Sequence, residues 1–214
     1  FKIFWDEAYI IHHLTEEIIE TPVLLNESKK YGTENRVFMF TSTSKITFPG
    51  AGVSAIACSV DSMKYMCKRF SVMIISYDKM NQLRHVRFLK NKEGVLAHMA
   101  KHRRRLVPCF DAVKTTFAHE LTPCGDIAHW TNPKGGYFIS LYVMPGCAKR
   151  VAQLCKDCGL TLTGAGAAFP YGIDPQDSHL RIAPTYPSLS EVETASMLLT
   201  VCVRLAVVEK LLAE

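Results

Sequence analysis

Three short apolar runs near the start of the chain constrain its fold most strongly, because each has the length of a strand and passes directly into polar residues. The runs lie in FKIFWDEAY (1–9), RVFMFTST (36–43) and GVSAIACS (52–59). Short apolar runs of this kind are typical of strands buried in a sheet. Helical patterns occupy part of residues 12–29 and residues 62–75. We therefore expect an α/β sheet region at the start of the chain.

The rest of the chain begins with one long helical pattern over residues 92–121. We expect this helix to break or kink near Pro108, because a proline ring clashes with the preceding turn. Strands are expected in GGYFISLYV and HLRIAP, and a helix in GCAKRVAQLCKDCG. A last helix is expected from Ser188, where Ser-Leu-Ser-Glu has the form of a capping box. The change of pattern places a domain boundary near Asn91.

The composition predicts a globular chain from a reducing compartment, which we take to be the cytoplasm. The chain has 214 residues, 48% of them hydrophobic, and a net charge of +5 carried by scattered basic residues, so we expect no nucleic-acid partner. No apolar run is long enough to cross a membrane. The eight cysteines fall in apolar runs without a leader sequence, and the pair Cys155 and Cys158 lacks a second pair at zinc-ligand spacing. We expect that pair to be structural and no metal to bind.

The loop FTSTSKITFPGAG carries a lone lysine, Lys45, just after the second apolar run. Such a lysine can simply reach into water, and that interpretation stays open. However, Asp6 and Tyr9 lie at the end of another run, and Ser42 and Ser44 flank the lysine. Ligands bind at strand ends in open α/β sheets. The loop is therefore a candidate ligand site.

These residue types match the chemical needs of pyridoxal 5'-phosphate. A lysine amine, here Lys45, holds the cofactor's aldehyde as a Schiff base. A carboxylate such as Asp6 keeps the pyridine nitrogen protonated, so that the ring accepts electrons. A phenol such as Tyr9 can reach the 3-oxygen, and the hydroxyls of Ser42 and Ser44 can donate to the phosphate.

In their order, these motifs resemble the fold-type I pyridoxal phosphate enzymes and, within them, the aspartate aminotransferase-like branch. The family's D-x-x-Y pair appears as Asp6 and Tyr9, and its S-x-S/T-K pattern as residues 42–45. A P-x-G-G-Y-F segment follows at residues 133–138, and then the substrate arginine as Arg181. The planar guanidinium of such an arginine holds an α-carboxylate with two hydrogen bonds, which a lysine would do poorly.

The resemblance covers the whole chain and implies an α/β fold, the C-terminal part of a PLP-dependent transferase fold. Residues 1–90 would be a remnant of the PLP-binding large domain, and residues 91–214 the α+β small domain. The family's enzymes are roughly twice as long, and this chain opens inside an apolar strand. We therefore expect a C-terminal fragment that lacks the N-terminal half of the same protein and is inactive alone.

One departure from the family concerns the cofactor's phosphate. The family usually has an arginine eight positions after the lysine, and Val53 stands there instead, as in a sub-branch with a similar SKITFxGAG loop. Asn81 or Arg84 is a candidate for a phosphate or cross-subunit contact, because the family's corresponding segment approaches the neighbouring subunit's site. A plain surface helix is an equally good interpretation of that segment.

The resemblance implies a PLP-dependent aminotransferase, active as a homodimer. It would move an amino group between a dicarboxylic amino acid like aspartate and a 2-oxo acid. Two alternatives stay open. One is an effector or regulatory domain that binds PLP or an amino acid without turnover, and the other is a PLP-dependent β-lyase.

Overall fold

The computed structural model describes residues 1–213, which form two compact units, Phe1–His102 and the residues from Arg103 onward. The division falls inside helix α4 (Lys92–Glu120), C-terminal to the boundary expected near Asn91. Each unit has its own three-stranded sheet. The assignment of residues 1–90 and 91–214 to the two domains of the family stays a prediction.

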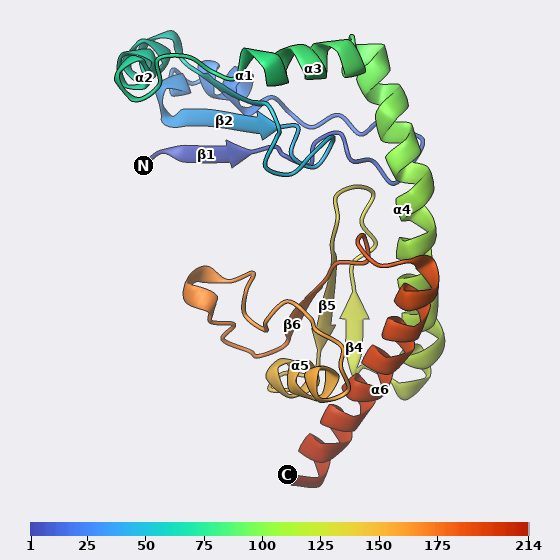
Figure 1. Cartoon of the computed structure of the whole chain (residues 1–214). Helices are drawn as coiled ribbons and strands as arrows, with labels where there is room; N and C mark the ends of the chain where they lie inside the picture. Colours follow the sequence, from blue (N-terminus) through green and yellow to red (C-terminus); the bar gives the residue numbers. More distant parts are fainter. Residues whose placement is uncertain (214) are drawn as a thin grey trace. The chain divides into compact units, whose positions relative to one another are not determined.

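The first unit is built on the sheet β1-β2-β3. Strand β1 (Ile3–Asp6) pairs in parallel with β2 (Val37–Ser42), and β2 pairs antiparallel with β3 (Ser54–Cys58). Figure 1 shows the arrows of β1 and β2 pointing the same way. The carboxyl ends of these two strands therefore lie at one edge of the sheet.

Two helices of this unit, α2 (Val60–Met73) and α3 (Lys79–Leu89), start at polar capping residues. The hydroxyl of Ser59 accepts a hydrogen bond from the N–H of Ser62 at 3.2 Å, and the carboxylate of Asp78 accepts one from the N–H of Asn81 at 2.9 Å. Of the helical pattern over residues 12–29, only the end forms a helix. That helix is α1 (Leu24–Lys29), and a 3-10 turn (Glu34–Arg36) follows it.

The prediction that residues 52–59 form a buried strand is right about the strand and wrong about its burial. The side chains of β3 are exposed or half-buried, and Phe4 of β1 is 71% exposed. Only β2 sends side chains into a core, through Val37 and Met39. The reason is that α2 and α3, which follow β3, contain no buried residue and so cover neither face of it.

The second unit packs an antiparallel sheet against helices. Phe117 of α4, Ile139 and Leu141 of the sheet, and Val203 of the last helix are fully buried in its core. Residues of the last helix lie beside the end of α4, where Arg204 pairs with Glu120 at 3.3 Å (Figure 1). The elements are β4 (Ala128–Trp130), β5 (Ile139–Val143), α5 (Ala148–Asp157), β6 (His179–Ile182) and α6 (Leu189–Ala213), with the sheet in the order β4-β5-β6.

Helix α4 does not break at Pro108, contrary to one of the two outcomes expected from the sequence. Pro108 is exposed, and so is Arg104, whose carbonyl loses its helical partner to the proline ring. Water can satisfy that carbonyl, so the helix continues. The capping box at Ser188 is confirmed, because Glu191 accepts from the Ser188 N–H at 2.7 Å while the Ser188 hydroxyl accepts from the Glu191 N–H at 3.4 Å. Among residues 1–213, no helix is both long and apolar enough to span a bilayer.

Two valines on α6 test the core of the second unit. Val203 is fully buried, whereas Val208 on the same helix is 50% exposed. We expect Val203→Ala to lower the free energy of unfolding by about 2–3 kcal/mol, through lost burial and the cavity that it leaves. Val208→Ala, with the same change in helix propensity, should shift it by less than about 0.5 kcal/mol. Urea unfolding measures both, and equal losses would contradict the packing described here.

Candidate active site

The parallel pairing of β1 and β2 brings Asp6 and the Lys45 loop to the same sheet edge. Asp6 lies opposite Phe40 in the register. The N–H of Glu7 then donates to the carbonyl of Phe40 at 2.7 Å, which continues the ladder past the end of β1. Beyond Phe40, β2 ends at Ser42. Two segments that are far apart in the sequence therefore leave the sheet side by side.

After β1 the chain turns back through Asp6 and Tyr9. An oxygen of the Asp6 carboxylate accepts a hydrogen bond from the N–H of Ala8 at 3.1 Å, a local contact that favours a turn. The carboxylate itself is exposed at the strand end, and Tyr9 is half-buried. The Tyr9 ring meets the ring of His12 edge-on, with centroids 5.5 Å apart. Asp6 is thus accessible, while Tyr9 is held by packing.

Lys45 lies in a tight turn that follows β2. The carbonyl of Thr43 accepts hydrogen bonds from the N–H groups of Ile46 and Thr47, both at 2.9 Å. Lys45 is exposed at the outside of this turn. The hydroxyls of Ser42 and Ser44 lie 2.7 Å apart, so one of their two hydrogens is used between them and the other can serve a ligand.

A second loop, residues 51–53, packs against this turn. A Cβ at Gly52 would lie 3.0 Å from the backbone nitrogen of Ser44, so a larger residue would crowd this close approach. The N–H of Val53 donates to the Thr43 hydroxyl at 2.9 Å. This contact fixes the backbone of Val53, which stands at the position where the family usually has an arginine.

The two candidates on α3 differ in their surroundings. The side-chain amide of Asn81 donates to the carbonyl of Ala51 at 2.8 Å, which ties α3 to residues 51–53. Arg84 is exposed on the same helix. A contact of either residue with phosphate or another subunit stays a prediction.

Sequence reasoning missed the histidines that bond to the Lys45 turn. They are His12, His85 and His98, none of which belongs to the motifs at the sheet edge. The ring of His12 donates to the carbonyl of Lys45 at 3.0 Å, and that of His98 to the carbonyl of Ile46 at 2.8 Å. His85 contacts two threonine hydroxyls of the turn. No local pattern signals these contacts, because they join residues 33 to 52 positions apart.

Burial sets the charge state of His12. Its side chain is buried, and this desolvation lowers the pKa of His12 below its ordinary value of 6.5. Hydrogen bonds to the carbonyls of Lys45 and Tyr9 act in the opposite direction, and the nearby charges of His13 and Lys45 lower the pKa further. The buried ring therefore favours its neutral form next to Lys45.

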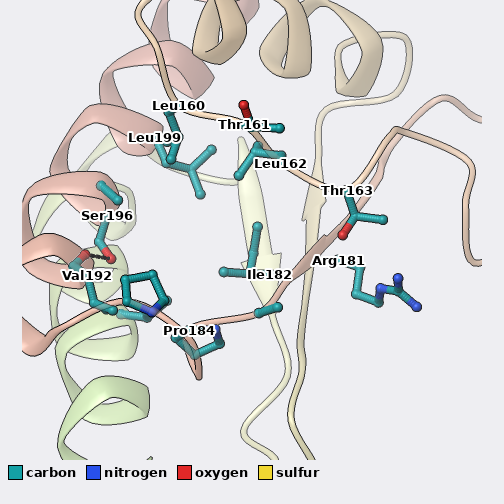
Figure 2. A pocket seen from close by; sticks show the side chains of 14 residues that line it. Leu160, Thr161, Leu162, Thr163, Arg181, Ile182, Pro184, Val192, Ser196 and Leu199 are labelled. Carbon is teal, nitrogen blue, oxygen red and sulfur yellow. Dashed lines mark hydrogen bonds between the residues drawn. The ribbon is translucent and has the colours of Figure 1, made fainter. Parts of the chain in front are cut away.

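In the second unit, Arg181 lies on β6 with its guanidinium carbon 4.6 Å from the centre of the Phe138 ring. Its Nε is buried and has no hydrogen-bond partner among residues 1–213. The next residue, Ile182, faces an apolar pocket of about 170 Å³ together with Leu162 and Leu199. Figure 2 shows the guanidinium directed away from this apolar lining. The Nε is thus a donor in place for an acceptor that the described part of the chain does not supply.

The cysteine pair lies at the end of α5, with Cys155 on the helix and Cys158 at its C-cap. Cys155 is buried and Cys158 is exposed. Burial, followed by the hydrogen bond and charge of Cys202, raises the pKa of Cys155 to about 12. A thiol with this pKa is a poor nucleophile at neutral pH, because the thiolate is the reactive form.

Comparison with known proteins identifies the class of this α/β fold. A crystal structure of an aspartate transaminase from Corynebacterium glutamicum superimposes with a TM-score of 0.95 at 43% identity, over 98% of this chain and 49% of that one. An α-aminoadipate aminotransferase from Thermus thermophilus shares the fold with a TM-score of 0.78 at 18% identity, over 97% of this chain and 51% of that one. The chain therefore has part of a PLP-dependent transferase fold, as the sequence predicted.

Sequence comparison narrows the class to a family. The family model described as Aspartate amino-transferase matches residues 1–214. A Mycolicibacterium smegmatis protein named as an aminotransferase is 46% identical over all of this chain and 50% of its own length. An aspartate aminotransferase from Corynebacterium glutamicum is 43% identical over 98% of this chain and 48% of its own length. The chain belongs to the aspartate aminotransferase family, and it spans about half the length of the curated relatives that it matches.

The lowered pKa of His12 predicts a dependence of stability on pH. The unfolded chain binds a proton at this residue near pH 6.5, whereas the folded chain does so only at lower pH. Stability should therefore fall on acidification below about pH 6.5, by at most about 1.4 kcal/mol per pH unit for one group. His12→Gln keeps a donor for the Lys45 carbonyl but cannot titrate.

Unfolding free energies measured between pH 5 and pH 8 test this expectation. The variant should lose less stability on acidification than the wild type, with part of the dependence remaining because burial also lowers the pKa of His102. Parallel curves for the two proteins would show that His12 titrates alike in the folded and unfolded states.

Proposed function

We propose that this chain supplies the lysine-bearing half of a PLP-dependent aminotransferase, which moves an amino group between an aspartate-like amino acid and a 2-oxo acid. The observation that carries the proposal is the parallel β1-β2 pairing, which brings Asp6 and the Lys45 turn to one sheet edge. The 43% identity to an aspartate aminotransferase favours dicarboxylic substrates. Activity as a homodimer and location in the cytoplasm stay predictions.

The residues at this edge suit the cofactor that the family implies. An exposed carboxylate, an exposed amine and an available hydroxyl hydrogen lie on segments that leave neighbouring strands. When bound, PLP supplies a pyridinium ring that accepts the electrons of the substrate's Cα–H bond.

Lys45 has two tasks in this proposal. Its amine attaches the cofactor covalently, and once released by the incoming amino acid it carries the proton from the substrate's Cα as general base and then acid. Both tasks need a neutral amine and a fixed starting point for the side chain. The backbone on either side of Lys45 is held by the hydrogen bonds of the turn and by the rings of His12 and His98.

Asp6 and Tyr9 act on the ring. The exposed Asp6 carboxylate can bond to the protonated ring nitrogen, and its charge favours that protonation. The phenol of Tyr9 can donate to the 3-oxygen. Because the packing of Tyr9 against His12 restricts its ring, this donor loses little conformational freedom when the cofactor binds.

The phosphate and the substrate carboxylate need separate groups. For the phosphate we propose the hydroxyls of Ser42 and Ser44, with Asn81 or Arg84 as a further contact. For the α-carboxylate of the substrate we propose Arg181, whose buried Nε has no hydrogen-bond partner within residues 1–213. Stacking on Phe138 holds the plane of the guanidinium, which favours two parallel hydrogen bonds.

Replacement of Lys45 tests the function directly. In a protein of the relatives' length that contains this chain, Lys45→Ala should reduce transamination between aspartate and 2-oxoglutarate by at least about 10³-fold, because attachment and proton transfer are both lost. Lys64→Ala on α2, whose side chain is 75% exposed, is the matched control and should keep full activity.

Other outcomes distinguish the alternatives. Release of ammonia and a three-carbon keto acid by the wild type would indicate a β-lyase. Cofactor or amino-acid binding without any turnover would indicate an effector domain. A Lys45→Ala variant with wild-type turnover would contradict the proposed role of this lysine.

A further inference from the structure

We propose that His85 is a positioning residue for Lys45: from helix α3 it holds both sides of the lysine turn through Thr43 and Thr47. The inference rests on the proposed function of Lys45, and it concerns a residue outside the motifs that carry the family resemblance. Nε2 of His85 lies 3.0 Å from the hydroxyl of Thr43 and 2.8 Å from that of Thr47. Those threonines stand two positions before and two positions after the lysine.

The hydrogen bonds define which nitrogen of His85 carries the hydrogen. Nδ1 lies 2.9 Å from the carbonyl oxygen of Asn81, which can only accept, so Nδ1 is the donor. In the neutral ring Nε2 is then an acceptor with one lone pair, which lies within reach of both threonine hydroxyls. The hydroxyl of Thr47 also lies 3.2 Å from the carbonyl of Thr43, so the two threonines and the ring form one cluster. The bond to Asn81, one helical turn earlier in α3, also fixes the ring orientation. The bond within α3 therefore orients the His85 ring so that Nε2 faces the hydroxyls of Thr43 and Thr47.

The threonines pass this restraint to the lysine backbone. The hydroxyl of Thr43 accepts from the N–H of Val53, so its own hydrogen is free to go to His85. The carbonyl of Thr43 accepts from the N–H groups of Ile46 and Thr47, which closes the turn around Lys45. A displaced Thr43 or Thr47 would therefore move the point from which the Lys45 side chain starts.

Two other histidines hold the inside of the turn. His12 donates to the carbonyl of Lys45 and His98 to that of Ile46, and the His98 ring is itself packed edge-on against Phe88 at 5.0 Å. These contacts hold two carbonyls, whereas His85 alone contacts the side chains on both flanks. Loss of His85 should therefore loosen the turn without removing it.

The first test measures the turn without any cofactor. Amide hydrogen exchange of Ile46 and Thr47 is compared in the wild type, His85→Leu and His85→Gln, in the protein of full length. We expect His85→Leu to exchange at least about tenfold faster, because the contact that ties both threonines to α3 is lost. His85→Gln keeps an acceptor and should stay within about threefold of the wild type. Gln82→Leu, an exposed change on the same helix, should leave both amides unchanged.

The second test measures catalysis. His85→Leu should lower kcat by at least about tenfold with little change in KM, and it should shift the pH at which the absorbance of the Lys45-bound cofactor changes, since a displaced lysine alters both. Thr47→Val removes one hydroxyl at constant shape. If the histidine acts through the turn, the double variant should be no worse than His85→Leu alone.

The outcomes separate this inference from the proposed function. Unchanged exchange in His85→Leu, or effects of His85→Leu and Thr47→Val that simply add, would overturn the positioning role. A wild type that shows no attachment of PLP to Lys45 would instead overturn the proposed function, and the exchange result would still stand. If His85→Leu does not fold, Thr47→Val carries both tests, with exchange and kcat at wild-type values counting against the inference.

Discussion

The parallel ladder between β1 and β2 is the interaction on which the candidate site depends. It sets Asp6 opposite Phe40, and the bond from Glu7 to Phe40 extends the pairing to the point where both strands end. A one-residue slip in this register would turn each side chain of β1 to the other face of the sheet. The Asp6 side chain would then leave the face of the sheet on which it lies beside Phe40 of β2, the strand that leads into the Lys45 turn. The strand register, rather than any single polar contact, therefore places Asp6 at the same sheet edge as the Lys45 turn.

The turn around Lys45 is held by contacts from several directions. Gly52 allows the loop 51–53 to approach the backbone of Ser44. Helix α3 bonds to that loop through Asn81 and to the turn through His85. An exposed lysine on a mobile loop would lose much of its orientation to chain entropy. A lysine whose neighbours are bonded on each side keeps a defined origin, which is what a group that must both attach a cofactor and transfer a proton requires.

Much of this fold could be predicted from local patterns. Strands β1, β2, β5 and β6 and helices α2, α5 and α6 follow local sequence patterns, and α2 and α6 begin after the capping residues Ser59 and Ser188. Strand β4 could not be predicted, because its three residues are too few to show the alternating pattern of a strand. The exposure of β3 was missed because burial depends on what covers a strand. The histidine contacts were missed because they join distant segments, whereas the motif residues at the sheet edge could be found from their order.

The protonation state of the cofactor's ring nitrogen tests the central claim most directly. With ¹⁵N-labelled PLP bound to the full-length protein, the account predicts a protonated pyridine nitrogen in the wild type, because the Asp6 carboxylate faces it. In Asp6→Asn the charge is lost, and the nitrogen should become unprotonated at neutral pH while the cofactor stays attached to Lys45. A nitrogen resonance that is the same in both proteins would contradict the placement of Asp6 and Lys45 at one functional edge.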